Sequence, residues 1–321
     1  MTRSRGVSRP PYAGRGTGSG RSVAGMLTRF SGEIADLTGR VLRATVAVSG
    51  SSSDGGSSGS GFFIDTRGHI VTNHHVISDV QPPITITLNG GAKALAGVVG
   101  VDRIADIAVL TLDGKWPHAL SLRRSRVRTG EMCLAVGNPL GRYPESVTIG
   151  VVSGLARTAS AGPGRPHYDL LQTDCDIHEG NSGGPLVDMR GRVIGITTLL
   201  DTESPYIGLA IPSATVRIIV PQLLRAGRVE RATLGISVAK RSVVVGGREL
   251  TGLEVVRLLR QRGQALKAGD IIVSVAREPV PDPPALFALL GGDRIGRATP
   301  VEVLRAGRRV SVTVTPWRLE P

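Results

Sequence analysis

The stretch Glu-Gly-Asn-Ser-Gly-Gly-Pro-Leu occupies residues 179–186 and sets one serine, Ser182, among three glycines. A serine hydroxyl is a weak nucleophile at neutral pH and needs a neighbouring base. Glycine permits the tight turn that exposes such a hydroxyl, because it adopts positive φ at no steric cost. The same turn can direct the backbone N–H groups of Gly180 and Ser182 towards one point, which is the geometry that stabilises an oxyanion. Taken alone, the stretch is more typical of an ordinary turn.

Two further motifs precede this stretch and supply the missing groups. Val-Thr-Asn-His-His-Val at 71–76 offers an imidazole, His75, and Ala-Asp-Ile-Ala-Val-Leu at 105–110 offers a carboxylate, Asp106. An imidazole serves as the base, and a buried carboxylate fixes its tautomer and stabilises the imidazolium. The order His, Asp, Ser is that of chymotrypsin and differs from the subtilisin and α/β-hydrolase orders. Each motif alone fits a structural role, but the three in this order favour a nucleophilic serine.

The pattern around these motifs predicts a mostly β fold. From residue 41 the chain runs through short apolar segments rich in Val, Ile and Thr that are separated by turns, which is typical of a β-barrel or sandwich. Residues 28–40 and 212–228 read as helices, and the second of these closes the first unit. A double barrel would carry His75 and Asp106 on its first barrel and Ser182 on its second, with the site in the cleft between them.

A smaller α+β unit is expected over residues 231–317. We therefore divide the chain into a basic segment at 1–40, which we expect to be disordered outside the helix at 28–40, a barrel unit at 41–228 and this second unit. The 321 residues carry a net charge of +13, and 40% of them are apolar. A basic segment attracts nucleic acid or anionic lipid, but no motif with interleaved aromatic residues is present. We expect a solvated Arg-rich segment and no specific nucleic-acid partner.

The N-terminus and the cysteines bear on the compartment. The first residues are basic but lack the apolar core of a secretory signal, and no stretch is long and apolar enough for a transmembrane helix. The two cysteines, Cys133 and Cys175, do not make a disulfide framework. These features favour a cytoplasmic location, and Cys175 is expected to be a small buried residue.

From about residue 41 to its end the chain resembles the HtrA (Deg-type) serine proteases. The matching segments include residues 59–65, 69–76, 105–110, 135–141, 146–157, 170–188 and 207–216. The resemblance implies a chymotrypsin-like double β-barrel followed by a PDZ domain. It implies an ATP-independent endopeptidase that cleaves unfolded or damaged proteins through an acyl-enzyme, without a cofactor or metal. The catalytic residues it implies are His75, Asp106 rather than Asp102, and Ser182.

The resemblance also implies an assembly and a rival function. Family members are trimers held by N-terminal residues, often aromatic ones, and Tyr12 and Phe30 are the aromatic residues available here. HtrA-like enzymes often rest in a state with a malformed oxyanion hole. The alternative is therefore a latent protease that acts mainly as a PDZ adaptor or holdase.

Two residues are candidates for the position that selects the substrate side chain. In trypsin-like proteases the position six before the nucleophile, here Asp176, lies at the base of the specificity pocket, and an Asp there suggests a preference for Arg or Lys. In the HtrA family the pocket is shaped by the loop after the nucleophile. Counting along that loop places Leu200 at an aliphatic lining position, which favours small apolar side chains such as Val, Ala or Ile.

The second unit resembles an HtrA-type PDZ domain, most clearly at residues 266–275. PDZ domains bind an extended C-terminus by adding it as a strand to a sheet edge. The segment that would hold the terminal carboxylate is Leu234, Gly235 and Ile236, and Leu234 would line the pocket for the last side chain. The segment before residues 269–270 is about three residues shorter than usual. A role restricted to regulating or bracing the protease is the alternative.

Overall fold

The first barrel carries two of the candidate residues. The computed structural model describes residues 23–51, 57–137, 145–160, 166–178, 180–198, 207–259 and 265–319. The closed order is β1 (Thr45–Ser51), β2 (Ser57–Phe63), β3 (His69–Thr72), β6 (Ile107–Thr111), β5 (Lys93–Asp102) and β4 (Gln81–Thr87). Buried aliphatic side chains such as Val48, Ile70 and Leu110 fill its interior. The helix α2 (His74–Ile77) follows β3 directly.

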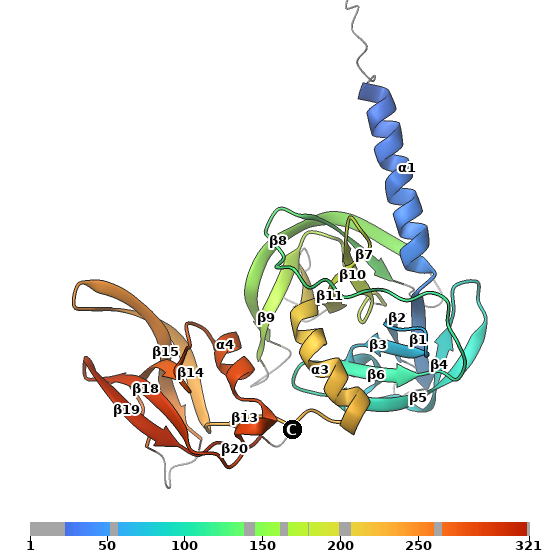
Figure 1. The fold of residues 1–321 in the computed structure, drawn as a ribbon. Coiled ribbons are helices and arrows are strands. Elements are labelled where there is room, and N and C mark those ends of the chain that lie inside the picture. Colours follow the sequence, from blue (N-terminus) through green and yellow to red (C-terminus); the bar gives the residue numbers. More distant parts are fainter. Residues whose placement is uncertain are drawn as a thin grey trace, which may run out of the picture. The chain divides into compact units, whose positions relative to one another are not determined.

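The second barrel carries the candidate serine. Its closed order is β10 (Pro185–Asp188), β11 (Val193–Thr198), β12 (Gly208–Pro212), β9 (Pro166–Thr173), β8 (Ser146–Ser160) and β7 (Met132–Gly137). Every residue of β10, β11 and β12 is buried, as expected for strands enclosed on both sides. The predicted double barrel is thus confirmed (Figure 1).

Helix α3 (Ser213–Ala226) closes the barrel unit where the sequence predicts it. It contacts β5 and β6 of the first barrel and β11 and β12 of the second. Gly227 follows in the left-handed conformation, with φ of 68°, and donates its N–H to the Leu223 carbonyl. This is the usual glycine ending of a helix, and it explains why the sequence located the helix boundary well.

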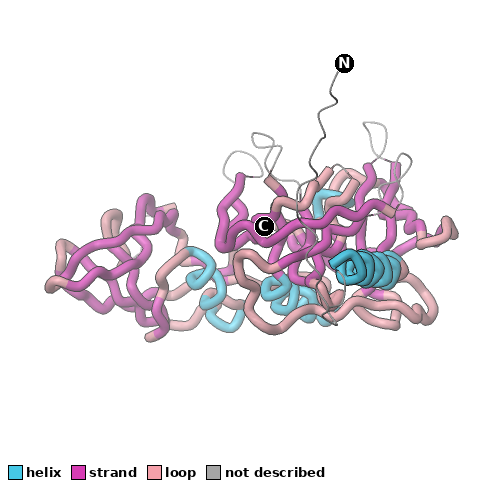
Figure 2. The backbone as a smooth tube through the Cα atoms, turned by 90° about the horizontal axis from the view of Figure 1, so that it is seen from above, coloured by secondary structure: helices cyan, strands magenta, loops and turns pink. Residues whose placement is uncertain are grey.

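The C-terminal unit is a small α+β domain. Its main sheet has the order β14 (Ile236–Val245), β15 (Arg248–Leu258), β16 (Ile271–Val275), β18 (Thr299–Arg305) and β19 (Arg308–Val314), and β17 (Glu278–Pro279) pairs with β16. A second pairing joins β13 (Ala232–Thr233) to β20 (Trp317–Arg318). Helix α4 (Pro283–Leu289) begins at Asp282, whose carboxylate accepts the N–H of Ala285, and the short helix η1 spans Gly292–Arg294. Strands dominate the described backbone (Figure 2).

The N-terminal segment differs from its prediction. Helix α1 runs over Val23–Leu42, so it contains the helix predicted at 28–40 and begins five residues earlier, in a stretch expected to be disordered. Its apolar residues recur at helical spacing, and Arg29 pairs with Glu33 one turn on. Gly25, Gly32 and Gly39 weaken the helical signal in the sequence, which is why the expectation failed. In the described ranges, no helix combines the length and apolarity that a membrane crossing requires.

Candidate active site

His75 leaves the first barrel on a short helix. Strand β3 ends at Thr72, Asn73 remains extended, and α2 begins at His74. Val76 and Ile77 are buried and anchor this turn in the barrel core. The side chain of His75 stays 41% exposed, so one edge of the imidazole remains open to a substrate.

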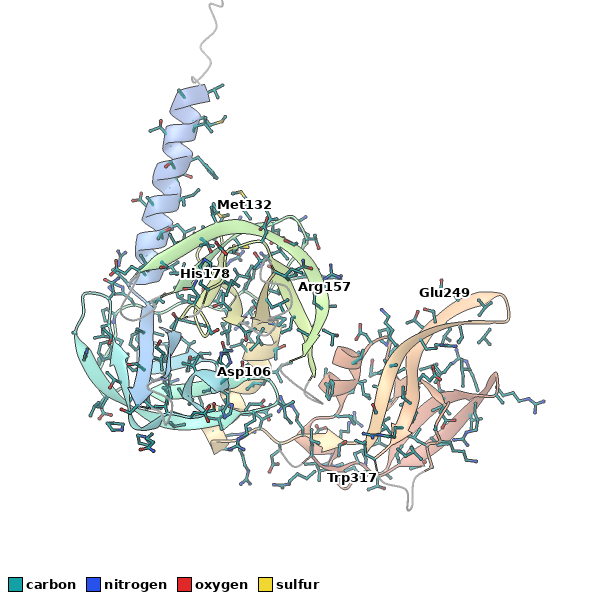
Figure 3. All side chains as sticks on the ribbon, turned by 180° about the vertical axis from the view of Figure 1, so that it is seen from behind. Asp106, Met132, Arg157, His178, Glu249 and Trp317 are labelled. Atoms are coloured by element: carbon teal, nitrogen blue, oxygen red, sulfur yellow. The ribbon has the colours of Figure 1, made fainter. Side chains whose placement is uncertain are left out.

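Asp106 orients that imidazole. His75 Nδ1 lies 2.6 Å from Oδ2 of Asp106, and the backbone N–H of His75 donates to Oδ1 at 2.8 Å. An ionised carboxylate only accepts hydrogen bonds, so the proton of this pair belongs to Nδ1. Nε2 is then the unprotonated nitrogen that is able to accept a proton. Asp106 itself is buried (Figure 3).

The backbone at Asp106 is held in an unusual conformation. Its φ is 55°, in the left-handed region that asparagine and aspartate tolerate best among non-glycine residues. The Asp106 carbonyl accepts the side-chain amide of Asn73 at 2.9 Å and the N–H of His74 at 3.2 Å. These bonds link the Asp106 turn to the β3–α2 junction, so both members of the pair are fixed by one network.

Asp102 has a different role, which separates it from Asp106. Its carboxylate is buried and accepts hydrogen bonds from Nη1 and Nη2 of Arg231, at 2.8 and 2.6 Å. Oδ1 also accepts the N–H groups of Ile104 and Ala105, which builds the turn that leads to Asp106. Asp102 therefore stabilises the turn, and the carboxylate that contacts His75 is that of Asp106.

Two adjacent threonines that the sequence interpretation missed support both sides of the site. Successive side chains on a strand point to opposite faces, and Thr197 and Thr198 end β11. Thr198 Oγ1 donates to Oδ2 of Asp106 at 3.4 Å. Thr197 Oγ1 donates to the carbonyls of Asn181 and Gly184, at 2.6 and 3.1 Å. A Thr-Thr pair in a strand is the only sequence signal, and it does not indicate these contacts.

Ser182 sits on a turn that the glycines make possible. Gly184 N–H donates to the Asn181 carbonyl at 2.9 Å, and Gly183 has φ of 87°. A Cβ at Gly183 would collide with the Ser60 carbonyl and the Thr72 hydroxyl. The turn is therefore pressed against strands β2 and β3 of the first barrel, and only glycine fits there.

Strand β2 fastens the serine turn beside His75. The Ser60 N–H donates to the Ser182 carbonyl at 2.8 Å, and Ser60 Oγ donates to the Gly180 carbonyl at 2.7 Å. Ser60 is another residue that sequence reasoning did not single out. Among the described residues no hydrogen bond joins Ser182 Oγ to His75, so the serine is placed by its backbone; such bonds are often long in unliganded enzymes.

The N–H groups around Ser182 divide into two sets. Three of them donate to backbone carbonyls: the N–H of Asn181 to His178, that of Gly183 to Thr197 and that of Gly184 to Asn181. For Gly180 and Ser182, no backbone hydrogen bond of the N–H is found within the described ranges. Gly180 adopts φ of 95°, which a residue with a side chain rarely does. This arrangement fits the two oxyanion donors that the sequence predicts.

The structure describes only one of the two candidate specificity residues, Asp176. The Asp176 carboxylate is 65% exposed and lies 3.1 Å from His178 Nε2, whose ring is 70% exposed. A carboxylate that faces solvent is poorly placed to line the base of a closed pocket. Leu200 lies outside the described residues.

His74 is the neighbour of His75 and is half-buried. Burial is the largest cause that lowers the pKa of His74, and the nearby charges of Arg103 and His75 lower it further, against Asp106. A neutral His74 is therefore favoured near neutral pH. It adds no charge beside the His75 imidazole.

Known proteins share this architecture. Residues 59–196 match the family described as a trypsin-like peptidase domain. The chain is 38% identical over 291 residues to "Protease Do-like 1, chloroplastic" of Arabidopsis thaliana, which covers 82% of this chain and 64% of that protein. It is 35% identical over 271 residues to "Probable periplasmic serine endoprotease DegP-like" of Brucella suis biovar 1 (strain 1330), over 80% of this chain and 52% of that protein. The chain thus spans about half to two thirds of the length of these relatives.

Solved structures extend the likeness to nearly the whole chain. The structure "HtrA-type protease AlgW with tripeptide" has a TM-score of 0.77 and 30% sequence identity, and the match covers 89% of this chain and 97% of that one. A serine endoprotease from Yersinia pestis matches with a TM-score of 0.68 at 30% identity, over 89% of this chain and 98% of that one. The chain belongs to the HtrA-type family of trypsin-like serine proteases.

Proposed function

We propose that this chain is a serine endopeptidase in which Ser182 is the nucleophile, His75 the general base and Asp106 the residue that orients it. The observation that carries the proposal is the 2.6 Å contact between His75 Nδ1 and the buried Asp106 carboxylate, beside a serine turn that only glycine permits. His75 Nε2 takes the proton of Ser182 as Oγ attacks the scissile carbonyl. The imidazolium then protonates the leaving amine, and an acyl-enzyme forms.

The oxyanion is stabilised by the N–H groups of Gly180 and Ser182. One such donor contributes roughly 3–4 kcal/mol of transition-state stabilisation. Water then enters, His75 removes its proton, and the acyl-enzyme is hydrolysed. The reaction uses only side chains and backbone groups of this chain, and no nucleotide takes part in it.

The substrates are unfolded or damaged polypeptides. The solved relative AlgW is described with a tripeptide, which supports peptide binding in this fold. Cleavage after small aliphatic side chains is favoured over cleavage after Arg or Lys, with Leu200 as the lining residue. The exposure of Asp176 and its contact with His178 support that choice, because neither leaves the carboxylate free in a pocket.

The C-terminal unit acts as a PDZ domain that binds C-terminal peptides. Strand β14 ends the sheet order, so its outer edge is open to an added strand, and α4 contacts β14. Gly235 precedes β14 with φ of 64°, and Leu234 is buried in the core of this unit. Leu234, Gly235 and Ile236 form the loop that holds the terminal carboxylate.

Helix α1 supplies the contact of a homotrimer. Val23, Met26, Leu27 and Phe30 are exposed and follow the i, i+3, i+4, i+7 spacing of one helix face. Tyr12, the other aromatic residue considered, lies outside the described residues. Light scattering coupled to gel filtration should give three times the monomer mass, and Leu27→Glu with Phe30→Glu should give the monomer.

The cytoplasm stays our prediction for the location of this chain. The names of the Arabidopsis and Brucella relatives place those proteins in the chloroplast and the periplasm, which weighs against it. Subcellular fractionation with compartment markers decides between these locations.

The deciding experiment compares hydrolysis of reduced casein by the natural chain and by Ser182→Ala. Loss of cleavage in the variant is the expected result, and the fragment ends give the side-chain preference. Cleavage that persists in the variant would refute the role of Ser182. Absence of cleavage by both, repeated with C-terminal peptides added, would favour the alternative of a latent protease that acts as an adaptor or holdase.

A further inference from the structure

A pair of thiols lies in the core of the second barrel, apart from the proposed catalytic residues. Cys133 belongs to β7 and Cys175 follows β9, and their Sγ atoms are 3.7 Å apart. Both are free and buried, in a cluster with Val152, Leu171 and Ile194. They are 42 positions apart in the sequence, so the fold alone brings the two sulfurs into contact.

A glycine on the intervening strand leaves the space in which the sulfurs meet. Cys133 is paired with Gly150 across β7 and β8. A Cβ at Gly150 would lie 3.1 Å from Cys175 Sγ and 2.8 Å from its backbone nitrogen. Thr173 fixes the backbone there, because its hydroxyl donates to the Val151 carbonyl at 2.8 Å and accepts the Cys175 N–H at 3.1 Å. The sulfur contact is therefore built into the barrel wall.

The two thiols are chemically unequal. The hydrogen bond from the Cys133 thiol is the largest cause that lowers the pKa of Cys175 to about 7, helped by the Thr173 hydroxyl and the Ala135 N–H, against burial. The same contact and burial raise the pKa of Cys133. Cys175 is thus the thiol of the pair that ionises more readily, and Cys133 stays protonated beside it. While protonated, the Cys175 thiol donates to the Cys133 carbonyl at 3.6 Å. Oxidisable pairs combine a low-pKa thiol, a second cysteine beside it and access from solvent. The first two features are present here, whereas both sulfurs are enclosed.

We propose that Cys133 and Cys175 are a covalent modification site, an intramolecular disulfide that a small hydroperoxide closes. The Cys175 thiolate attacks the terminal peroxide oxygen, the O–O bond breaks, and Cys175 becomes a sulfenic acid as hydroxide leaves. Cys133 sulfur then attacks the Cys175 sulfur, its proton passes to the departing oxygen, and water is released. Two thiols and one hydrogen peroxide give one disulfide and two waters. A thiol reductant restores the pair.

Burial selects the oxidant and predicts the consequence. Both sulfurs are enclosed, so a molecule near the size of water reaches them more readily than glutathione disulfide does. The sulfurs must approach from 3.7 Å to about 2.05 Å, a small movement within the side chains. Closing the loop between them restricts the unfolded chain, so Tm should rise by roughly 5–10 °C. His75, Asp106 and Ser182 take no part, so this inference does not depend on the proposed function.

The test exposes the natural chain, Cys133→Ala and Cys175→Ala to hydrogen peroxide, quenches with catalase, and alkylates under denaturing conditions. In the natural chain we expect both thiols to become unavailable, a Cys133–Cys175 linked peptide 2 Da lighter than its two parts, and a Tm increase reversed by dithiothreitol. The single-cysteine variants carry the same methionines and control for methionine oxidation. They should show no linked peptide and no reversible Tm increase.

Two results would overturn the proposal. In the first, the natural chain keeps both thiols while its methionines oxidise. In the second, Cys175 of the natural chain is oxidised to sulfinic acid and no linked peptide forms. Each is read from the natural chain alone, so the test stands even if an alanine variant folds poorly. A non-reducing gel separates an intramolecular bond, which leaves the monomer band, from a bond between chains.

Discussion

Thr198 donates its hydroxyl to Oδ2 of Asp106 at 3.4 Å, although the two residues belong to different barrels. The same oxygen accepts the hydrogen bond from Nδ1 of His75. The carboxylate that orients the imidazole is therefore itself fixed by the second barrel, which also holds the serine turn through Thr197. Strand β11 thus contacts both the Asp106 carboxylate and the serine turn.

Replacing Thr198 by Val removes this hydroxyl and keeps the shape of the side chain. One hydrogen bond contributes about 0.5–1.5 kcal/mol, so kcat/KM on a peptide substrate should fall about 2- to 10-fold, mostly in kcat. Thr198→Ser keeps the hydroxyl and should retain most of the activity. Unchanged activity in Thr198→Val together with a loss in Thr198→Ser would mean that the methyl group, through packing, is what matters.

Asp106→Asn should lower kcat roughly 10³- to 10⁴-fold, because an amide no longer requires the proton on Nδ1 and the imidazole loses its oriented tautomer. Asp102→Asn is the matched control. Its amide oxygen still caps the turn at Ile104 and Ala105, so kcat should stay within about tenfold. Comparable losses of kcat in the two variants would contradict the assignment of Asp106. Circular dichroism of both variants establishes that they are folded.

Gly183→Ala should abolish activity and destabilise the chain by several kcal/mol, because its Cβ would collide with the backbone of β2. Gly130 has nearly the same φ, 86° against 87°, but nothing lies within 4 Å of its Cβ position. Gly130→Ala should therefore cost only about 1–2 kcal/mol, the cost of the left-handed conformation alone. Urea denaturation of the two variants separates the collision from the conformational cost.

Glu131 should stabilise the second barrel at neutral pH, and this contribution should be lost in acid. Its hydrogen bond from Arg123, and then that from Arg128, hold the pKa of Glu131 at about 2, below its ordinary value of 4.5. A carboxylate with a lowered pKa stabilises the fold above the unfolded value and loses that contribution as the pH falls towards the folded value. Glu131→Gln should be less stable by about 1–2 kcal/mol at pH 7, and the gap should close between pH 5 and pH 2.

The control for Glu131 is Glu33→Gln, which breaks the exposed pair with Arg29 on α1. An exposed pair contributes about 0–1 kcal/mol, so its unfolding curve should change little at any pH. Thermal unfolding between pH 7 and pH 2 measures both variants. A gap for Glu131→Gln that stays constant down to pH 2 would show that the residue acts through packing.

The sequence indicates the candidate residues where a local rule operates. The turn at Ser182 needs glycine, and the Asp106 motif opens a strand, so both appear as short patterns. The sequence does not indicate Ser60, Thr198 or Arg231, because each acts through a contact with a distant part of the chain. No local pattern marks such a partner. The same reason hid the contact between Cys133 and Cys175.

Helix α1 was underestimated for a different reason. Three glycines at seven-residue spacing lower its intrinsic helix propensity, and the Arg-, Gly- and Ser-rich residues before it suggest disorder. The helix nevertheless carries apolar residues at helical spacing along one face, namely Val23, Leu27, Phe30 and Ile34, and at its end Leu37 and Val41 are buried. The helix α3 had no such conflict, and its limits agreed with the prediction to within two residues.

The central claim is that Ser182 is a nucleophile activated by His75. A fluorophosphonate probe reacts with activated serines, and peptide mapping by mass spectrometry locates the adduct. We expect one adduct, on Ser182, which forms in the natural chain and is lost in His75→Ala, while Thr198→Ser is labelled at nearly the natural rate. Labelling of Ser182 that is undiminished in His75→Ala, or an adduct on another serine of a chain that cleaves casein, would contradict it.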